Sequence, residues 1–135
     1  MNNKTKLSTP LPLRGGWVGL QEQQVKDAMK ETFVRLMKLK QEDGVRWVGT
    51  VSDLVELAHM MWYDGVSIDE CGRLLNFSNT VSRLCGALGV KPPRKPHTVM
   101  NNIRKRKTPT LGLLARCQQL MQQGEEPLER MINNS

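Results

Sequence analysis

Aromatic side chains are scarce in this 135-residue chain, at 4% of residues. Leucine, valine, methionine and alanine recur instead at helical spacing, so a modest core of packed helices is feasible and wholesale disorder is not favoured. At this length we expect one domain. The sequence therefore predicts a small, mainly α-helical domain over residues 20–124, with a flexible arm at 1–19 and an acidic tail at 125–135.

Long apolar runs and paired cysteines are missing as well. Residues 1–16 hold no apolar run long enough for export or for crossing a membrane. The three cysteines form no CxxC pair, and only His59 and His97 could join them in a zinc site. We therefore expect reduced thiols and a cytoplasmic protein with no metal, no cofactor and no membrane partner.

Patterns that carry catalysis are absent too. The basic half of the sequence contains no paired carboxylates, and no glycine-rich phosphate loop or nucleophile elbow occurs. Cys85 and Cys117 fall on apolar helical stripes, where a buried and inert thiol is expected, and Cys71 is widely separated from both. The sequence therefore gives little support for an enzyme.

Negative charge is missing from a long inner stretch of the chain. The formal net charge is +7, but residues 1–70 carry −1, residues 125–135 carry −2, and residues 71–124 carry ten Lys/Arg and no Asp/Glu. Such a stretch within sequence that has helical periodicity predicts a surface of a single sign. This surface favours a polyanionic partner.

Hydrophobic periodicity predicts helices along most of the chain. An apolar stripe that includes Met29 and Phe33 predicts a helix over residues 20–40, which Gly44 would end. This helix either packs in the core or mediates a homodimer. Residues 45–49 are rich in strand formers and predict a strand-like connector.

The next helix has a defined start and end. Thr50 is placed to cap backbone N–H groups, Asp53 occupies the first turn, and Gly65 is placed after the last turn. His59 lies beside the apolar stripe of this helix. A packed or surface imidazole is favoured over a ligand or a general base, because no partner for His59 is evident nearby in the sequence.

A pair of short helices is the first candidate site. Ser67 and Glu70 form a capping box that predicts a helix over residues 68–76, and a second helix is predicted over residues 80–88, closed by Gly89. Two such helices across a tight turn resemble the helix-turn-helix of many transcription regulators, although this turn is about one residue shorter. The alternative is an αα corner that only completes a helical core. The groove-facing residues would be Asn79, Ser82 and Arg83.

Prolines mark the boundaries of the remaining segments. Three prolines make residues 91–96 a stiff basic loop, which could serve as a wing. A helix is predicted over residues 97–107, and Thr108 with Pro109 starts a last helix that ends before Gly124. The tail that follows is expected to fray.

A run of seven uncompensated cations within residues 91–107 is the second candidate site. Lys and Arg on a loop and a helix end can neutralise phosphates, giving sequence-independent affinity that falls steeply with salt. Asn101 and Asn102 could read adenine or contact phosphate. The helix dipole would account for one or two cations at the C-terminus of this helix, not for seven. The cations are Lys91, Arg94, Lys95, Arg104, Lys105, Arg106 and Lys107.

Duplex DNA fits this pattern better than RNA or a membrane surface. Sequence-specific RNA modules usually expose aromatic stacking residues, and none falls within residues 91–107. A membrane surface ranks third, because the helix in this run lacks a large aromatic or leucine face.

Several sequence pieces also resemble a known family. In their order and spacing they are similar to the C-terminal region of the RteC family, regulators of excision in conjugative transposons of Bacteroides-type bacteria. The resemblance covers roughly residues 45–121, whereas residues 77–96 depart from the pattern. It implies a helix-turn-helix or winged-helix-like domain that acts on promoter DNA of a mobile element. The matching pieces are Val45–Thr50, Asp53–Ala58, Gly65, and Ile103–Thr108 leading into Leu111, Leu113 and Leu114.

We therefore expect a DNA-binding transcriptional regulator of a mobile genetic element. The helix at residues 80–88 would enter the major groove while the cations of residues 91–107 clamp backbone phosphates. The alternative is a non-catalytic interaction module that docks an acidic protein through the same basic surface. A homodimer is compatible with either function.

Overall fold

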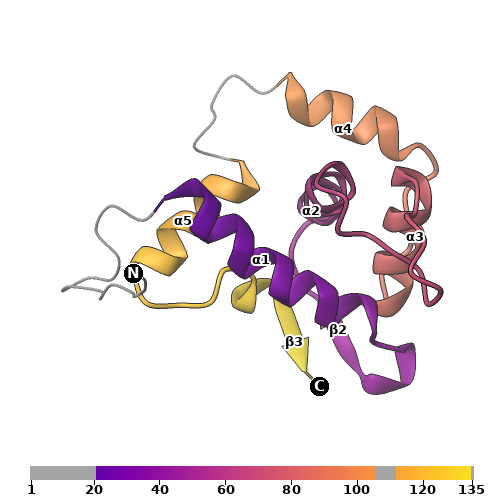
Figure 1. Cartoon of the computed structure of the whole chain (residues 1–135), viewed down its shortest axis with the longest axis horizontal. Helices are drawn as coiled ribbons and strands as arrows, with labels where there is room; N and C mark the ends of the chain where they lie inside the picture. The colour runs from indigo at the N-terminus through magenta and orange to yellow at the C-terminus, as the bar shows by residue number, and fades with distance from the viewer. Residues whose placement is uncertain (1–20, 106–111, 135) are drawn as a thin grey trace.

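The computed structural model describes residues 21–105 and 112–134 (Figure 1). Within these residues the chain is mainly α-helical, with five α-helices and one two-stranded sheet, so the predicted fold class is confirmed. The arm predicted at residues 1–19 lies outside the described residues. The elements in chain order are α1 (Glu22–Met37), η1 (Gln41–Asp43), β2 (Val45–Trp47), α2 (Val51–Tyr63), α3 (Phe77–Ala87), α4 (Pro96–Arg104), α5 (Leu113–Gln122), η3 (Glu129–Met131) and β3 (Ile132–Asn134).

Helix α1 forms where its apolar stripe predicts. Met29 and Phe33 are buried on this stripe, which packs against α5 and α3. The helix ends at Met37 and not at Gly44. Gly44 instead closes the 3-10 turn η1 with a φ of 75°, a left-handed conformation that glycine adopts without a steric penalty.

Helix α2 lies at the centre of the helical packing. It appears almost end-on in Figure 1, with α4 above it, α3 beside it, and α1 and α5 on its other side. As predicted, the Thr50 hydroxyl oxygen accepts a hydrogen bond from the Asp53 backbone N–H at 3.0 Å, and Gly65 follows the helix with a φ of 72°. The buried face consists of Leu54, Val55, Leu57, Ala58 and Met61.

The helix predicted over residues 68–76 does not form. Ile68 and Leu74 make an antiparallel β-bridge around a turn. The Asp69 carboxylate organises this turn, because its Oδ1 accepts hydrogen bonds from the backbone N–H groups of Cys71 at 2.8 Å and Arg73 at 3.0 Å. A side chain that satisfies local N–H groups in this way competes with a helix. The two-helix corner predicted from this capping box is therefore wrong.

Ser67 is not a helix cap but a buried contact to the next helix. Its hydroxyl group shares a hydrogen bond of 2.7 Å with the Thr80 hydroxyl group of α3. Asn76 is the residue that caps α3, since its Oδ1 accepts from the Asn79 backbone N–H at 2.7 Å. The helix therefore starts at Phe77, three residues before the predicted range, and ends at Ala87, with the predicted Gly89 just after its C-cap at a φ of 70°.

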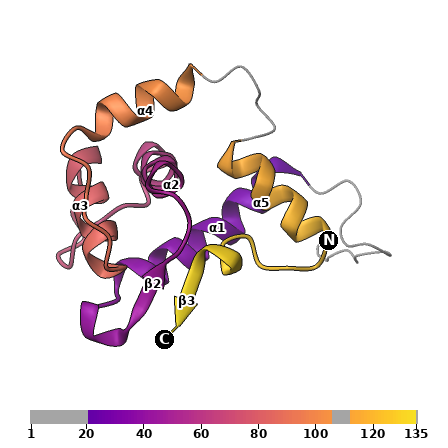
Figure 2. The same cartoon turned by 180° about the vertical axis from the view of Figure 1, so that it is seen from behind.

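The C-terminal segment is part of the fold, so the prediction that it frays is wrong. Leu128 is fully buried and Met131 is nearly so. β3 pairs antiparallel with β2, placing Ile132 opposite Trp47, and the two strands lie below the helices in Figures 1 and 2. Apolar residues among and after the acidic ones supply this burial. The predicted start of the last helix at Thr108–Pro109 lies outside the described residues, and α5 has Gly112 as its N-cap.

Candidate nucleic-acid interface

Five exposed cations lie on the α3–α4 loop and at the two ends of α4. Lys91 and Arg94 come from the loop, Lys95 is the N-cap of α4, and Arg104 and Lys105 end the helix. We call these five residues the basic edge. No Asp or Glu of the described residues forms an ion pair with any of them. Arg106 and Lys107, which complete the predicted run, lie outside the described residues.

Helix α4 carries positive charge at the end where charge of this sign is unfavourable. Its first turn holds no acidic residue, and Arg94 and Lys95 lie at its N-terminus, where the helix dipole is positive. Arg104 and Lys105 interact favourably with the negative, C-terminal end of the helix dipole. Arg94 and Lys95 interact unfavourably with its positive, N-terminal end. Helix stability therefore does not explain the cations at the N-terminal end of α4.

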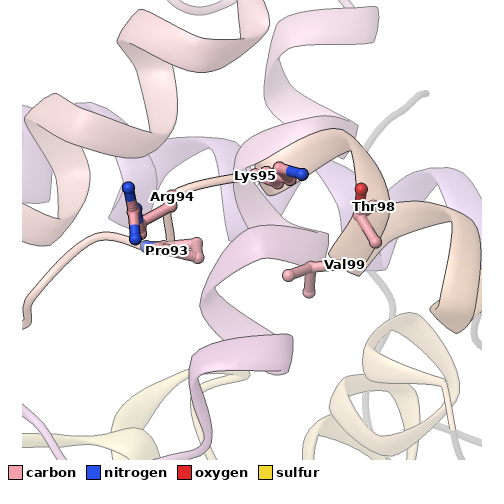
Figure 3. Close-up of a pocket in the computed structure, with 5 residues that line it drawn as sticks. All are labelled: Pro93, Arg94, Lys95, Thr98 and Val99. Atoms are coloured by element: carbon pink, nitrogen blue, oxygen red, sulfur yellow. The ribbon is translucent and has the colours of Figure 1, made fainter.

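Arg94 and Lys95 also border a hollow next to α4. Pro93, Thr98 and Val99 complete its lining. In Figure 3 the guanidinium group of Arg94 lies at the left of the view, while the Lys95 amine and the Thr98 hydroxyl group lie to its right. All three residues line the same hollow, but only Lys95 and Thr98 lie close together in this view.

Two other cations of the acid-free stretch are neutralised by carboxylates that precede this stretch. Arg83 pairs with Glu70, and Arg116 pairs with Asp53. Residues 71–124 therefore supply fewer cations without a carboxylate partner than the sequence predicts. Of the six described cations of this stretch that remain, five form the basic edge and the sixth, Arg73, lies on the turn before α3.

The candidate residues on α3 are accessible but carry little free charge. Asn79 and Ser82 are exposed, whereas Arg83 is partly buried and bound to Glu70. Helices α3 and α4 meet near their N-terminal ends, where the rings of Phe77 and His97 lie 4.9 Å apart. Of the two predicted sites, the basic edge is the one left with unpaired charge.

His59 connects α2 to the basic edge. The Arg104 Nη2 donates a hydrogen bond to the His59 Nε2 at 2.8 Å, with the neutral imidazole as acceptor. Burial lowers the pKa of His59, and the positive charge of Arg104 and the nearby His97 lower it further. The prediction of a packed imidazole did not include this partner, which lies 45 residues away in the sequence.

A polar clamp fixes the start of α5 against α2. The Asp53 carboxylate accepts hydrogen bonds from both terminal nitrogens of Arg116, and the contact raises the pKa of the Arg116 guanidinium. The Glu56 Oε2 accepts from the Leu113 backbone N–H at 2.9 Å. The capping pattern at Thr50 placed Asp53 in a helix first turn but gave no sign of this contact. The clamp therefore fixes the position of the helix that follows the basic run of residues 91–107.

Two of the three cysteines are buried. Burial raises the pKa of Cys85 to about 11 and that of Cys117 to about 12, so both stay protonated, as the apolar stripes predict. Cys71 is exposed, and all three are free thiols. Within residues 21–105 and 112–134, no three His, Cys, Asp or Glu side chains are grouped to hold a metal ion.

No helix in the described ranges has the length and apolar character needed to cross a membrane. In comparisons with known proteins, no family model matches the chain, and no curated protein or solved structure shows significant similarity to it. The likeness to the RteC family therefore remains a prediction from sequence.

Proposed function

We propose that this protein binds double-stranded DNA through the basic edge and acts as a transcriptional regulator. The observation that carries the proposal is the grouping of five exposed cations without ion pairs on one loop and one short helix. Arg83 and Arg116 have carboxylate partners, whereas the five cations of the basic edge have none among the described residues. Unpaired cations on a loop and a short helix suit a row of phosphates, whose neutralisation releases counterions.

The length of α4 fits a DNA groove. Nine helical residues at about 1.5 Å each separate Lys95 from Lys105 by roughly 15 Å, which is comparable to the major groove width of about 12 Å. Cations at both ends of α4 could thus contact phosphates on the two sides of one groove. Asn101 and Asn102, both exposed, lie between them and could contact base edges.

This geometry favours α4 over α3 as the groove helix. Helices α2, α3 and α4 pack together, and α4 is the third of them in chain order. In a helix-turn-helix domain the recognition helix follows a supporting helix and presents its outer face to the groove. The loop from Leu88 to Lys95 is longer than the usual turn.

The regulatory part of the proposal rests on the sequence resemblance. Pieces such as Val45–Thr50 and Ile103–Thr108 resemble the RteC family, which implies action on promoter DNA of a mobile element in the cytoplasm. A homodimer on two half-sites would be consistent with such a regulator.

A salt series with matched charge removal tests the DNA proposal. We would measure the dissociation constant for a mixed-sequence duplex, by fluorescence anisotropy, for the parent protein, for K95A/K105A, and for K38A/K40A as a control. Lys38 and Lys40 are exposed and lie near the C-terminal end of α1. Each lost phosphate contact should reduce the log–log salt slope by about 0.9, so K95A/K105A should reduce it by roughly 2.

The control variant should bind as the parent does. Equal loss of affinity in both double variants would show that general charge, and not the basic edge, attracts DNA. A parent protein that binds no duplex at low salt would overturn the proposal and favour docking on an acidic protein.

A further inference from the structure

Five aromatic rings from three helices form a continuous series beside the basic edge. We call them the aromatic ladder: Tyr63, His59, Trp62, Phe77 and His97. The Tyr63 ring lies nearly parallel to that of His59, with 16° between their planes and 6.3 Å between centroids. The rings of Trp62 and Phe77 lie 5.3 Å and 5.2 Å from His59, and His97 contacts Phe77.

The outer members of the ladder are open to solvent. Tyr63 is 77% exposed and Trp62 is 36% exposed, while Phe77 at the centre is buried. The other Trp and Phe residues that the structure describes, Phe33 and Trp47, are buried in the core. Within the described ranges, the exposed aromatic rings of this chain therefore lie at one location.

The ladder is joined directly to positive charge. Arg104 of the basic edge donates its hydrogen bond to His59, the ring that Tyr63 faces. The carboxylate nearest in sequence, Asp64, is occupied by Lys30 of α1 at 3.7 Å. An open ring face beside an arginine suits a nucleobase with its attached phosphate, because every base offers a π-face and every nucleotide carries a negative charge.

We propose that the aromatic ladder is a stacking site for an unpaired base of single-stranded DNA, with Tyr63 as the platform and Arg104 contacting the adjacent phosphate. This inference rests on the proposed function, since the same basic edge holds the backbone. Residues 91–107 contain no Phe, Trp or Tyr, but the fold brings those of α2 and α3 against α4. The protein would thus hold DNA at a junction between paired and unpaired strands.

Two DNA probes and two variants test the site. The probes are a fluorescein-labelled single strand of mixed sequence and the same strand annealed to its complement. Tyr63→Ala removes the ring, and Tyr63→Phe is the matched control that keeps it. Because Tyr63 is mostly exposed, both variants should fold, which thermal melting by circular dichroism would verify.

Tyr63→Ala should weaken single-strand binding by roughly 5- to 100-fold, the range expected for one lost stacking contact. Its affinity for the duplex, and the affinity of Tyr63→Phe for both probes, should stay within about twofold of the parent. Single strands should also quench tryptophan fluorescence, and Trp62→Phe should remove most of this quenching.

Different failures have different meanings. If the parent binds the duplex but Tyr63→Ala binds the single strand as well as the parent does, the stacking site is wrong and the proposed function stands. If the parent binds neither probe, both the site and the proposed function are wrong.

Discussion

At the residue scale, Arg104 joins the basic edge to the aromatic ladder. Its guanidinium is exposed, yet it also donates a hydrogen bond to the neutral ring of His59. The contact holds Arg104 against His59, the ring that Tyr63 faces, and fixes the end of α4 against α2. The protonation state of His59 therefore affects both the stability of the fold and the position of a cation on the proposed DNA surface.

Acid should destabilise the protein through His59. Its pKa is lowered from 6.5 in the folded chain, mainly by burial and then by Arg104 and His97. The unfolded chain thus takes up the proton first, so the His59 contribution is constant above pH 6.5, falls as the pH decreases below 6.5, and levels off below the folded pKa.

Urea unfolding at about pH 7.5 and about pH 5.5 measures this effect. The parent should lose more stability between the two values than His59→Gln, which cannot titrate. Equal losses in the two proteins would show that His59 does not carry the pH dependence.

At the element scale, the clamp between α2 and α5 is expected to contribute measurably to stability. Asp53→Asn leaves the Arg116 guanidinium without its carboxylate while Asp53 itself is almost fully buried. Because the Arg116 side chain is one-third exposed, we expect a loss of about 2 kcal/mol, below the range for fully buried pairs.

The matched control is Glu22→Gln, which breaks an exposed ion pair with Lys26 on α1. It should cost under about 1 kcal/mol in the same urea titration. A loss in Asp53→Asn no greater than that of the control would mean that the clamp does not stabilise the fold.

The C-terminal segment should also matter for stability. Leu128→Ala removes a fully buried side chain and should cost about 2–5 kcal/mol, whereas Leu74→Ala, at a site 72% exposed, should cost under about 0.5 kcal/mol. Thermal unfolding of the two variants makes the comparison. Similar melting temperatures would contradict the packing of the C-terminal segment against the core.

Local signals predicted most of the helices and failed where distant contacts decide. The cap at Thr50 and the glycine stops at Gly65 and Gly89 act within a few residues, and all three occur as predicted. The capping box at Ser67 was wrong because Ser67 bonds to Thr80 of another helix. The pairing of β3 with β2 joins segments nearly 90 residues apart, which periodicity cannot detect.

The candidate site was likewise predicted in part from local sequence and missed where distant contacts decide. The cations of the basic edge were predicted from composition, since a run of Lys and Arg without acids is visible in the sequence. Their ion-pairing state was not, because the acids that bind Arg83 and Arg116 come from residues before the acid-free stretch. The aromatic ladder likewise depends on α2, α3 and α4 meeting in space.

At the scale of the whole molecule, the net charge of +7 is unevenly distributed. Carboxylates that precede the basic stretch neutralise Arg83 and Arg116, and five of the other described cations of that stretch lie on one loop and one outer helix, seen at the upper edge of Figures 1 and 2. A concentrated charge of this kind steers a polyanion to one face of the protein.

Mapping the bound surface by nuclear magnetic resonance tests this account most directly. Duplex DNA would be titrated into ¹⁵N-labelled protein, and the backbone and Asn side-chain amide shifts followed for each residue. The account predicts that the largest shifts fall on residues 91–105, including the side chains of Asn101 and Asn102, while α1 and β3 change little. Shifts concentrated on α1 or α5, or no shifts at a large excess of DNA, would contradict it.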